Sequence, residues 1–368
     1  MHDFENDDVY EILRKRLDCF PTSFPKTDDG TEIQILKRLF TKEEAEIAGV
    51  LPLFTLDEPE NAQTISRRMG KDANELGVIL DGMAKNGLAY VEDNVDIVKV
   101  YALLPFIHGS WEFNIHKFDS ELAQRCDDFV CGPLASQKGA TKLNFTRIIP
   151  VSEAVSRETL IRPYHDVIRT IESATSFCVI PCVCRTQTRL AGKGCGHPEE
   201  TCLFLNDYAE YLNRIEKGRR LTKDEAITLM TKCEEAGLIH ISDNVRQHTV
   251  ICSCCPCSCT ALRGLVRAAK ANRIDVVQSY RSYFRLIVDQ SSCTGCESCI
   301  ERCCTEALSM KDDVVVHEPG KCLACGACVT VCPTETLSLA RKPEKEPEAP
   351  TANDLGNLYT EMGWRDKV

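Results

Sequence analysis

Five cysteines crowd the segment ICSCCPCSCT, residues 251–260, and the whole chain holds 23 cysteines in 368 residues. The five are Cys252, Cys254, Cys255, Cys257 and Cys259. Neighbouring thiols this dense do not readily pair with one another, because a disulfide needs Cα atoms ~4.4–6.8 Å apart and side chains turned together. Thiolates are soft metal ligands, so the spacing of the other cysteines decides which chemistry is expected.

The spacing Cys-x2-Cys-x2-Cys-x3-Cys occurs twice near the C-terminus, at Cys293, Cys296, Cys299 and Cys303 and again at Cys322, Cys325, Cys328 and Cys332. A [4Fe–4S] cube has four corners that need thiolates; a tight loop supplies three, and the fourth comes from elsewhere. The repeat therefore predicts two cubes. Zinc knuckles are the alternative, but tetrahedral zinc usually pairs two C-x2-C arms.

Residues 283–341 resemble bacterial-type 2[4Fe–4S] ferredoxin domains, in which each fourth cysteine ligates the other cluster. The resemblance implies one cluster on Cys293, Cys296, Cys299 and Cys332, and another on Cys322, Cys325, Cys328 and Cys303. In this family a proline usually follows the last cysteine of each motif. Pro333 follows Cys332 in the second copy, but in the first copy Cys304 takes the place of that proline. We expect Cys304 to be a spare buried thiol.

Four further cysteines, Cys182, Cys184, Cys195 and Cys202, fall within one loop region. A C-x-C pair on an extended segment would point both sulfurs to one side, ~6.6–7 Å apart. The glycines of AGKGCGH permit the turns that return Cys195 to this pair. These four thiols predict one more [4Fe–4S] centre, and a zinc site that also uses His197 is the alternative.

The five cysteines of residues 252–259 either complete a cluster of their own or exchange ligands with the 182–202 loop. Pro256 bends the chain between the pairs 252, 254 and 257, 259. An ordinary relay cluster, a non-cubane cluster with an iron open to substrate, and a zinc or purely structural role all remain possible. One or two clusters beyond the ferredoxin pair are therefore expected.

The PCVCR sequence, the later cysteine loop and the C-terminal repeat together resemble a group of multi-domain iron–sulfur proteins of anaerobes. Such proteins are described as ferredoxin-type or oxidoreductase subunits. The resemblance spans most of residues 150–341 and implies a redox role without a particular substrate.

The elements that must position these cysteines indicate an α+β, multi-domain chain. We expect an N-terminal extension (1–30), a winged-helix-like domain (31–120), a Cys-rich α/β iron–sulfur module (145–270), the dicluster ferredoxin-like domain (283–341) and a linker with a C-terminal tail (342–368). Within the module, a helix should start near Pro163, SFCVIP should form a strand, and residues 206–216 a helix. Thr222 and Glu225 form a capping-box pattern for a helix that ends before Gly237.

The N-terminal segment TKEEAEIAGVLPLF through KVYALL shows helix–helix–helix–hairpin periodicity and resembles a winged-helix domain. A recognition helix on DNA should be basic, because phosphate contacts dominate affinity. Residues 41–100 instead carry six Lys or Arg against twelve Asp or Glu. A docking or dimerisation module is therefore favoured over a redox-sensing regulator that binds DNA.

The remaining composition narrows the function further. A net charge of −11 disfavours nucleic acid as a partner. The acidic N-terminus has no signal-peptide core, and no apolar run reaches the ~20 residues of a membrane span, so we expect a cytoplasmic protein with reduced thiols. No strand–G-x-G-x-x-G–helix fingerprint occurs, so no flavin or nicotinamide is expected on this chain.

The sequence thus predicts an electron-transfer protein, an oxidoreductase subunit that relays single electrons through iron–sulfur clusters to or from a redox partner. A flavoenzyme is one candidate partner, and the chain should act within a complex or as a homo-oligomer rather than as a stand-alone enzyme. Residues 283–341 carry five Lys or Arg against eight Asp or Glu, which predicts a basic docking face on the partner. Substrate chemistry at a cluster in residues 182–259 is the alternative.

Overall fold

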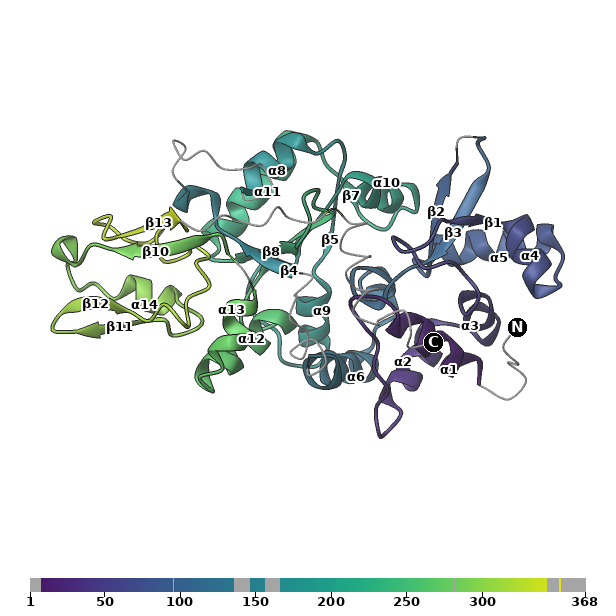
Figure 1. The fold of residues 1–368 in the computed structure, drawn as a ribbon, viewed down its shortest axis with the longest axis horizontal. Helices are drawn as coiled ribbons and strands as arrows, with labels where there is room; N and C mark the ends of the chain where they lie inside the picture. Colours follow the sequence, from purple (N-terminus) through teal and green to yellow (C-terminus); the bar gives the residue numbers. More distant parts are fainter. Residues whose placement is uncertain are drawn as a thin grey trace.

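Three parts follow one another along the long axis of the molecule: the N-terminal helices, a central sheet with its helices, and two small C-terminal hairpins (Figure 1). The structure, a computed structural model, describes residues 8–94, 96–135, 146–155, 166–280, 282–342 and 351. Its mixture of helices and four separate sheets agrees with the α+β expectation. Within the described residues, no helix combines the length and the apolar character needed to cross a membrane.

The N-terminal part places three helices before a small antiparallel sheet of order β1-β3-β2. Its elements are α1 (Val9–Asp18), α2 (Thr31–Leu39), α3 (Lys42–Ala48), β1 (Glu60–Asn61), α4 (Ala62–Met69), α5 (Ala73–Lys85), β2 (Ala89–Asp93) and β3 (Lys99–Leu103). The expected order of helices followed by a hairpin is present. Helix α5 begins after Asp72, whose carboxylate accepts hydrogen bonds from the amides of Asn74 and Glu75.

An aromatic connector joins this part to the centre through η1 (Phe106–Ser110), η2 (Ile115–Lys117), α6 (Ser120–Phe129) and η3 (Val130–Leu134). Phe106, Trp111 and Phe113 are buried, as expected for core residues. The indole N–H of Trp111 donates to Oε1 of Gln187 at 3.0 Å. The connector is thereby fixed against the central part.

The central sheet has six strands in the order β4-β8-β9-β6-β5-β7, and every neighbouring pair is antiparallel. The strands are β4 (Thr146–Ile149), β5 (Phe177–Pro181), β6 (Glu200–Leu205), β7 (Arg219–Arg220), β8 (Ile239–Asp243) and β9 (Val250–Cys254). The helices are η4 (Ser152–Ala154), α8 (Val167–Ser173), α9 (Val183–Leu190), α10 (Asn206–Arg214), α11 (Lys223–Glu235), α12 (Thr260–Lys270) and α13 (Ile274–Ser279). Helices α8 and α11 cover one face, while α12 and the N-terminal part cover the other (Figure 1).

Local sequence signals locate several of these elements correctly. The hydroxyl of Thr222 accepts from the amide of Glu225, whose carboxylate accepts from the amide of Thr222 at 2.8 Å, so the predicted capping box is confirmed. Gly237 follows α11 with a left-handed φ of 77°, which glycine adopts without strain. The helix expected near Pro163 begins at Val167 as described, and residues 156–165 lie outside the described residues.

The C-terminal part consists of two antiparallel pairs, β10 with β13 and β11 with β12. Its elements are β10 (Phe284–Val288), η6 (Gln290–Ser292), α14 (Ser298–Arg302), β11 (Leu308–Lys311), β12 (Val314–His317) and β13 (Leu337–Arg341). Strand β10 precedes the first cysteine motif, and β11 and β12 lie between the two motifs. The carbonyl of Cys325 accepts from the amide of Val151 at 2.9 Å, which attaches this part to the central one.

Glycine is required where these two parts meet. Gly326 has a φ of 82°, and a Cβ there would lie 2.5 Å from the Cβ of Ala154. No side chain fits at that distance, so a larger residue would push the C-terminal part away from the central sheet.

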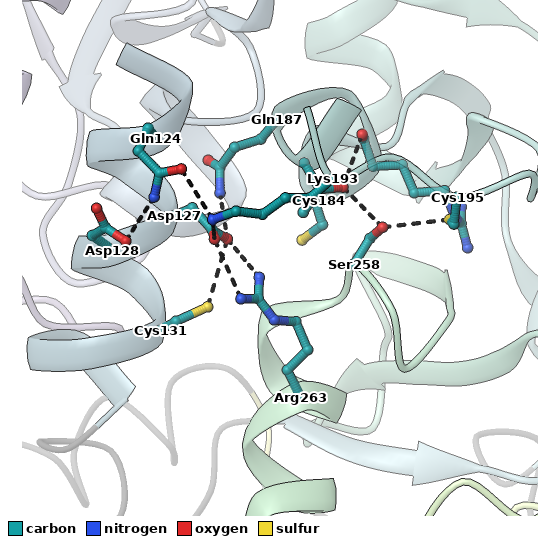
Figure 2. A network of polar contacts seen from close by, with 12 residues as sticks. Gln124, Asp127, Asp128, Cys131, Cys184, Gln187, Lys193, Cys195, Ser258 and Arg263 are labelled. Atoms are coloured by element: carbon teal, nitrogen blue, oxygen red, sulfur yellow. Dashed lines mark hydrogen bonds and ion pairs between the residues drawn. The ribbon is translucent and has the colours of Figure 1, made fainter. Parts of the chain in front are cut away.

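A buried carboxylate ties the connector to two central helices (Figure 2). Asp127 on α6 is 2 % exposed. It accepts from Arg263 of α12 at 2.6 Å and from Gln187 of α9 at 3.2 Å, and the ammonium of Lys193 lies 3.9 Å away. A buried charge is tolerated because these donors replace its lost hydration.

Replacing Asp127 should therefore loosen the contact between the connector and the central part. We expect Asp127→Ala to lower the apparent free energy of unfolding by about 3 kcal/mol, because it leaves the Arg263 charge without its partner. Urea unfolding of anaerobically prepared protein, followed by circular dichroism, measures this. Asp128→Ala is the matched control, since Asp128 is exposed and its loss should cost less than about 0.5 kcal/mol. Equal effects of the two changes would contradict this role of Asp127.

Candidate metal centres

The eight cysteines of the C-terminal repeat form two neighbouring groups. Electrostatic interactions join Cys332 to Cys296 and Cys299, and join Cys303 to Cys325 and Cys328. Each fourth cysteine thus lies near the thiols of the other copy, and its ligation of the other copy's cluster, which the ferredoxin resemblance implies, stays a prediction. We call the first set, Cys293, Cys296, Cys299 and Cys332, the outer group, and the second set, Cys303, Cys322, Cys325 and Cys328, the inner group.

The backbone around these thiols favours thiolates. Backbone and side-chain hydrogen bonds from Ser298 lower the pKa of Cys296. Burial opposes ionisation of Cys332, but the amides of Thr334 and Leu337 outweigh it and lower its pKa. In the inner group, the amide of Ala307 lies 3.3 Å from the Cys303 sulfur. Hydrogen bonds to sulfur of this kind stabilise the charged ligands of a cluster.

A small pocket lies among the thiols of the inner group, and Cys304 lines it as well. All four thiols of the group line this pocket, together with apolar side chains such as Leu286 and Leu308. Three ligands come from one loop and the fourth from the other copy, which is the donor set that a [4Fe–4S] cube requires. The residues present therefore fit such a cluster.

Seven cysteines line a second pocket in the central part. We call it the six-thiol pocket after the six that contact one another in series, which are Cys182, Cys184, Cys202, Cys252, Cys254 and Cys259. The seventh, Cys255, also belongs to a second group. Strand register places three of the six. Cys202 on β6 lies directly opposite Cys252 on β9, and their sulfurs are 3.8 Å apart. Cys254 follows Cys252 by two residues and therefore points to the same face of the sheet.

The other three thiols come from the beginnings of two helices. Cys182 is the N-cap of α9, Cys184 lies in the first turn of α9, and Cys259 is the N-cap of α12. A helix N-terminus carries a partial positive charge, so two of them favour anionic groups in this pocket. The prediction of an extended C-x-C segment at residues 182–184 is wrong, because α9 starts at Val183, directly after β5.

Contacts between thiols run around the pocket and change their acidity. Cys184 contacts both Cys182 and Cys259, and these contacts lower the pKa of the latter two. Contacts with Cys202 and Cys254 lower the pKa of Cys252. One cube needs four thiolates, so this pocket offers two more than a cube requires.

The connector contributes two polar side chains to this pocket that the sequence analysis did not single out, His108 and Glu112. Burial raises the pKa of Glu112 to about 7. Burial alone would lower the pKa of His108, but contacts with Cys252 outweigh it and raise the value. His108 also has a φ of 60°, an uncommon conformation for a residue other than glycine. Neither residue belongs to a motif, so only the folded arrangement reveals them.

Three cysteines of the central part form a compact group, which we call the three-thiol group: Cys195, Cys255 and Cys257. Cys255 also lines the six-thiol pocket. Their sulfurs all lie within 4.8 Å of one another, and Cys195 and Cys255 are 3.8 Å apart. Burial opposes ionisation of Cys195, but hydrogen bonds from Ser258 and from the amide of His197 lower its pKa to about 7. Cys255 is buried and Cys257 is exposed.

Thiols from the two cysteine-rich loops therefore lie together in both places. Cys182, Cys184 and Cys202 lie with Cys252, Cys254 and Cys259, whereas Cys195 lies with Cys255 and Cys257. A single centre made of Cys182, Cys184, Cys195 and Cys202 is not the observed arrangement, because the turn after α9 carries Cys195 away from the pocket. In the other loop, Cys252, Cys254 and Cys259 line the pocket and Cys257 does not.

Arg185 lies between the pocket and the three-thiol group. Its guanidinium is buried and donates to the carbonyl of Ser253 at 2.7 Å and to the Thr201 hydroxyl at 2.5 Å. It also interacts electrostatically with Cys182 and Cys255. One cation thus stabilises thiolates of both groups while it holds β6, β9 and α9 together.

The inner group and the six-thiol pocket are in contact through Cys304. Cys254 and Cys259 share a hydrophobic cluster with Leu323, against which Cys304 and Cys325 pack. Cys304 also interacts electrostatically with Cys325 of the inner group and with Cys259 of the pocket. The spare thiol of the first motif therefore lies at the boundary between two groups of candidate ligands.

Comparison with known families agrees with the C-terminal geometry. Residues 285–345 match the family model described as a 4Fe-4S dicluster domain. Searches among curated proteins and among solved structures each found no match. The match, together with the cysteine groups, supports an iron–sulfur protein, and the central and N-terminal parts are interpreted from their own residues.

The adjacent residues Cys303 and Cys304 provide a matched test of ligation. We expect Cys303→Ala to remove about four irons per chain, because it deprives the inner group of its fourth thiolate. Cys304→Ala should keep the full iron content, because Cys304 lies outside that group. Iron and sulfide analysis of anaerobically purified variants measures both. Loss of iron in the Cys304 variant would overturn this assignment.

Proposed function

We propose that this chain carries single electrons between a redox partner, which docks on the dicluster domain, and the six-thiol pocket. The observation that supports this most directly is the packing of Cys304 and Cys325 against the cluster that contains Cys254 and Cys259. Because of this packing, thiols of the inner group and of the six-thiol pocket contact the same hydrophobic cluster.

The outer group, the inner group and the pocket thiols would hold the iron–sulfur clusters. Bound [4Fe–4S] clusters supply one-electron redox chemistry at potentials of ~−700 to +450 mV, set by charge, hydrogen bonds and solvent exposure. The chain's own residues orient the ligands and exclude water. Leu262, Leu265 and Leu323 are almost completely buried between the pocket and the inner group, so this boundary is dry.

The outer group is the end of this series that faces solvent. Cys296 is exposed, and exposed carboxylates of Glu297 and Glu301 follow it in the chain. Asp312 and Asp313, at the turn between β11 and β12, are also exposed. This charge favours a redox partner with a basic docking face, such as a flavoenzyme, and it would guide the encounter at low ionic strength.

The N-terminal part would then serve docking or dimerisation. Val78 on α5 is 74 % exposed and Ile97, in the turn between β2 and β3, is 85 % exposed. Apolar side chains on these elements suit a protein surface better than a phosphate backbone, and Glu75 adds negative charge to α5. A winged-helix-like module that binds protein fits these residues better than a reader of DNA.

The pocket proposal has a direct test in metal content. We expect more than eight irons per chain in anaerobically purified protein, because the dicluster domain accounts for only about eight. Cys252→Ala should reduce the content to about eight and remove one signal from the electron paramagnetic resonance spectrum of the reduced protein. Cys178→Ala is the control, since this buried β5 thiol lies outside the outer group, the inner group, the six-thiol pocket and the three-thiol group. A wild-type chain with eight irons or fewer would exclude a cluster in the pocket.

Substrate chemistry in the six-thiol pocket is a second candidate function. One observation in favour is that the six-thiol pocket holds two thiols more than a [4Fe–4S] cube needs. The other is that Glu112 lines the pocket. Burial raises its pKa to about 7, so this carboxyl group can donate a proton near neutral pH.

Adding cyanide, a small ligand for iron with an open coordination position, tests this second function. It should shift the resonance signal that Cys252→Ala removes and leave the signals of the dicluster domain unchanged. If cyanide leaves every signal unchanged, the pocket serves only as a relay.

A further inference from the structure

The three-thiol group has the dimensions of a site for one ion. Within the described residues, it is the one group of three or more Cys, His, Asp or Glu whose ligand atoms all lie within 4.8 Å of one another. Tetrahedral zinc with Zn–S bonds of ~2.3 Å separates its sulfur ligands by ~3.8 Å. The sulfurs of Cys195 and Cys255 are 3.8 Å apart.

The groups that fit clusters are more widely spread. Neither the inner nor the outer group reaches the compactness of the three-thiol group, although all eight of these cysteines are described. This difference is expected, because an iron–sulfur cube lies between its four thiolates and holds them further apart than a single ion does. Spacing therefore separates the three-thiol group from the two groups of the dicluster domain. In the six-thiol pocket, Cys202 and Cys252 are also 3.8 Å apart, but no three of its sulfurs lie within 4.8 Å of one another.

The fold brings these ligands together from two loops. Cys195 comes from the turn between α9 and β6, and Cys255 and Cys257 come from the turn between β9 and α12, on either side of Pro256. Cys257 is exposed, so one side of the group faces solvent. His197, a ligand only in the alternative of a zinc site in the 182–202 loop, is not part of this compact group.

Polar neighbours support Cys195 as a thiolate ligand. The Ser258 hydroxyl lies 3.4 Å from the Cys195 sulfur and accepts a hydrogen bond from Thr188 at 2.9 Å (Figure 2). The proton of Ser258 is thus free to point at the sulfur. Hydrogen bonds of this kind orient metal ligands, and the nearby Arg185 balances part of their negative charge.

We propose that Cys195, Cys255 and Cys257 bind a single zinc ion, separate from any cluster in the six-thiol pocket and with a fourth position open to solvent. The ion fastens the turn after α9 to the turn before α12. Both turns adjoin pocket thiols, since α9 carries Cys184 and α12 begins after Cys259. This inference does not depend on the proposed electron transfer.

Metal analysis of the full-length chain tests the proposal, using protein purified without air from cells supplied with both iron and zinc. We expect about one zinc per chain and, from X-ray absorption at the zinc edge, three sulfur neighbours at ~2.3 Å. Cys257→Ala should reduce zinc at least fivefold and leave iron, sulfide and the resonance signals unchanged. Cys257 is exposed, so this change should not disturb the core.

Cys131→Ala is the matched control, because Cys131 is a thiol outside the three-thiol group. The protein with this change should retain its zinc. Cys195→Ala provides a second variant and should lose zinc like Cys257→Ala. Wild-type protein without zinc, unchanged zinc in both variants, or loss of about four irons in either variant would overturn the proposal. The last of these results would place a cluster at the three thiols and would leave the proposed electron transfer intact.

Discussion

The antiparallel register of β6 and β9 is the constraint on which the central sites depend. It sets Cys202 opposite Cys252, with their sulfurs 3.8 Å apart, and the alternation of the strand then sends Cys254 to the same face. Beyond the end of β9, Cys255 packs with the core under α8 and α11, on the other face. A register shift of one residue would move Cys252 and Cys254 out of the six-thiol pocket together. Hydrogen bonds between strands therefore decide which thiols belong to which group.

The sequence predicted the C-terminal part well because its ligands follow a local rule. The spacing of the repeat lies within short loops, and the family match at residues 285–345 covers the same cysteines. In the central part, the capping box at Thr222 and the strand at SFCVIP were also predictable, because both signals lie within a few residues. Elements with a local cause could be located from the sequence alone.

The grouping of the central thiols could not be predicted from the sequence, because it depends on contacts between distant segments. Cys195 is closer in sequence to Cys202 than to Cys255, yet the turn after α9 carries it to Cys255. The segment at residues 182–184 was expected to be extended, but the helix that starts at Val183 turns Cys184 into the pocket. His108 and Glu112 reach the pocket only because the connector packs against α9, where Trp111 donates to Gln187. The contact between Trp111 and Gln187 joins distant segments, and no spacing of residues in the sequence predicts it.

Long-range packing also sets the order of the cysteine groups, from the exposed outer group through the inner group to the buried pocket. Gly326 lets the C-terminal part approach Ala154 closely, and the carbonyl of Cys325 accepts from Val151 just after β4. Cys304 therefore meets Cys259 across a dry boundary rather than across solvent. The outer group lies beyond the inner group and keeps Cys296 exposed among carboxylates. The cysteines thus run from a charged surface to a buried pocket. A surface site suits exchange with a partner, whereas a buried pocket with protonatable side chains suits a destination for electrons, so the asymmetry of burial favours flow between these two ends.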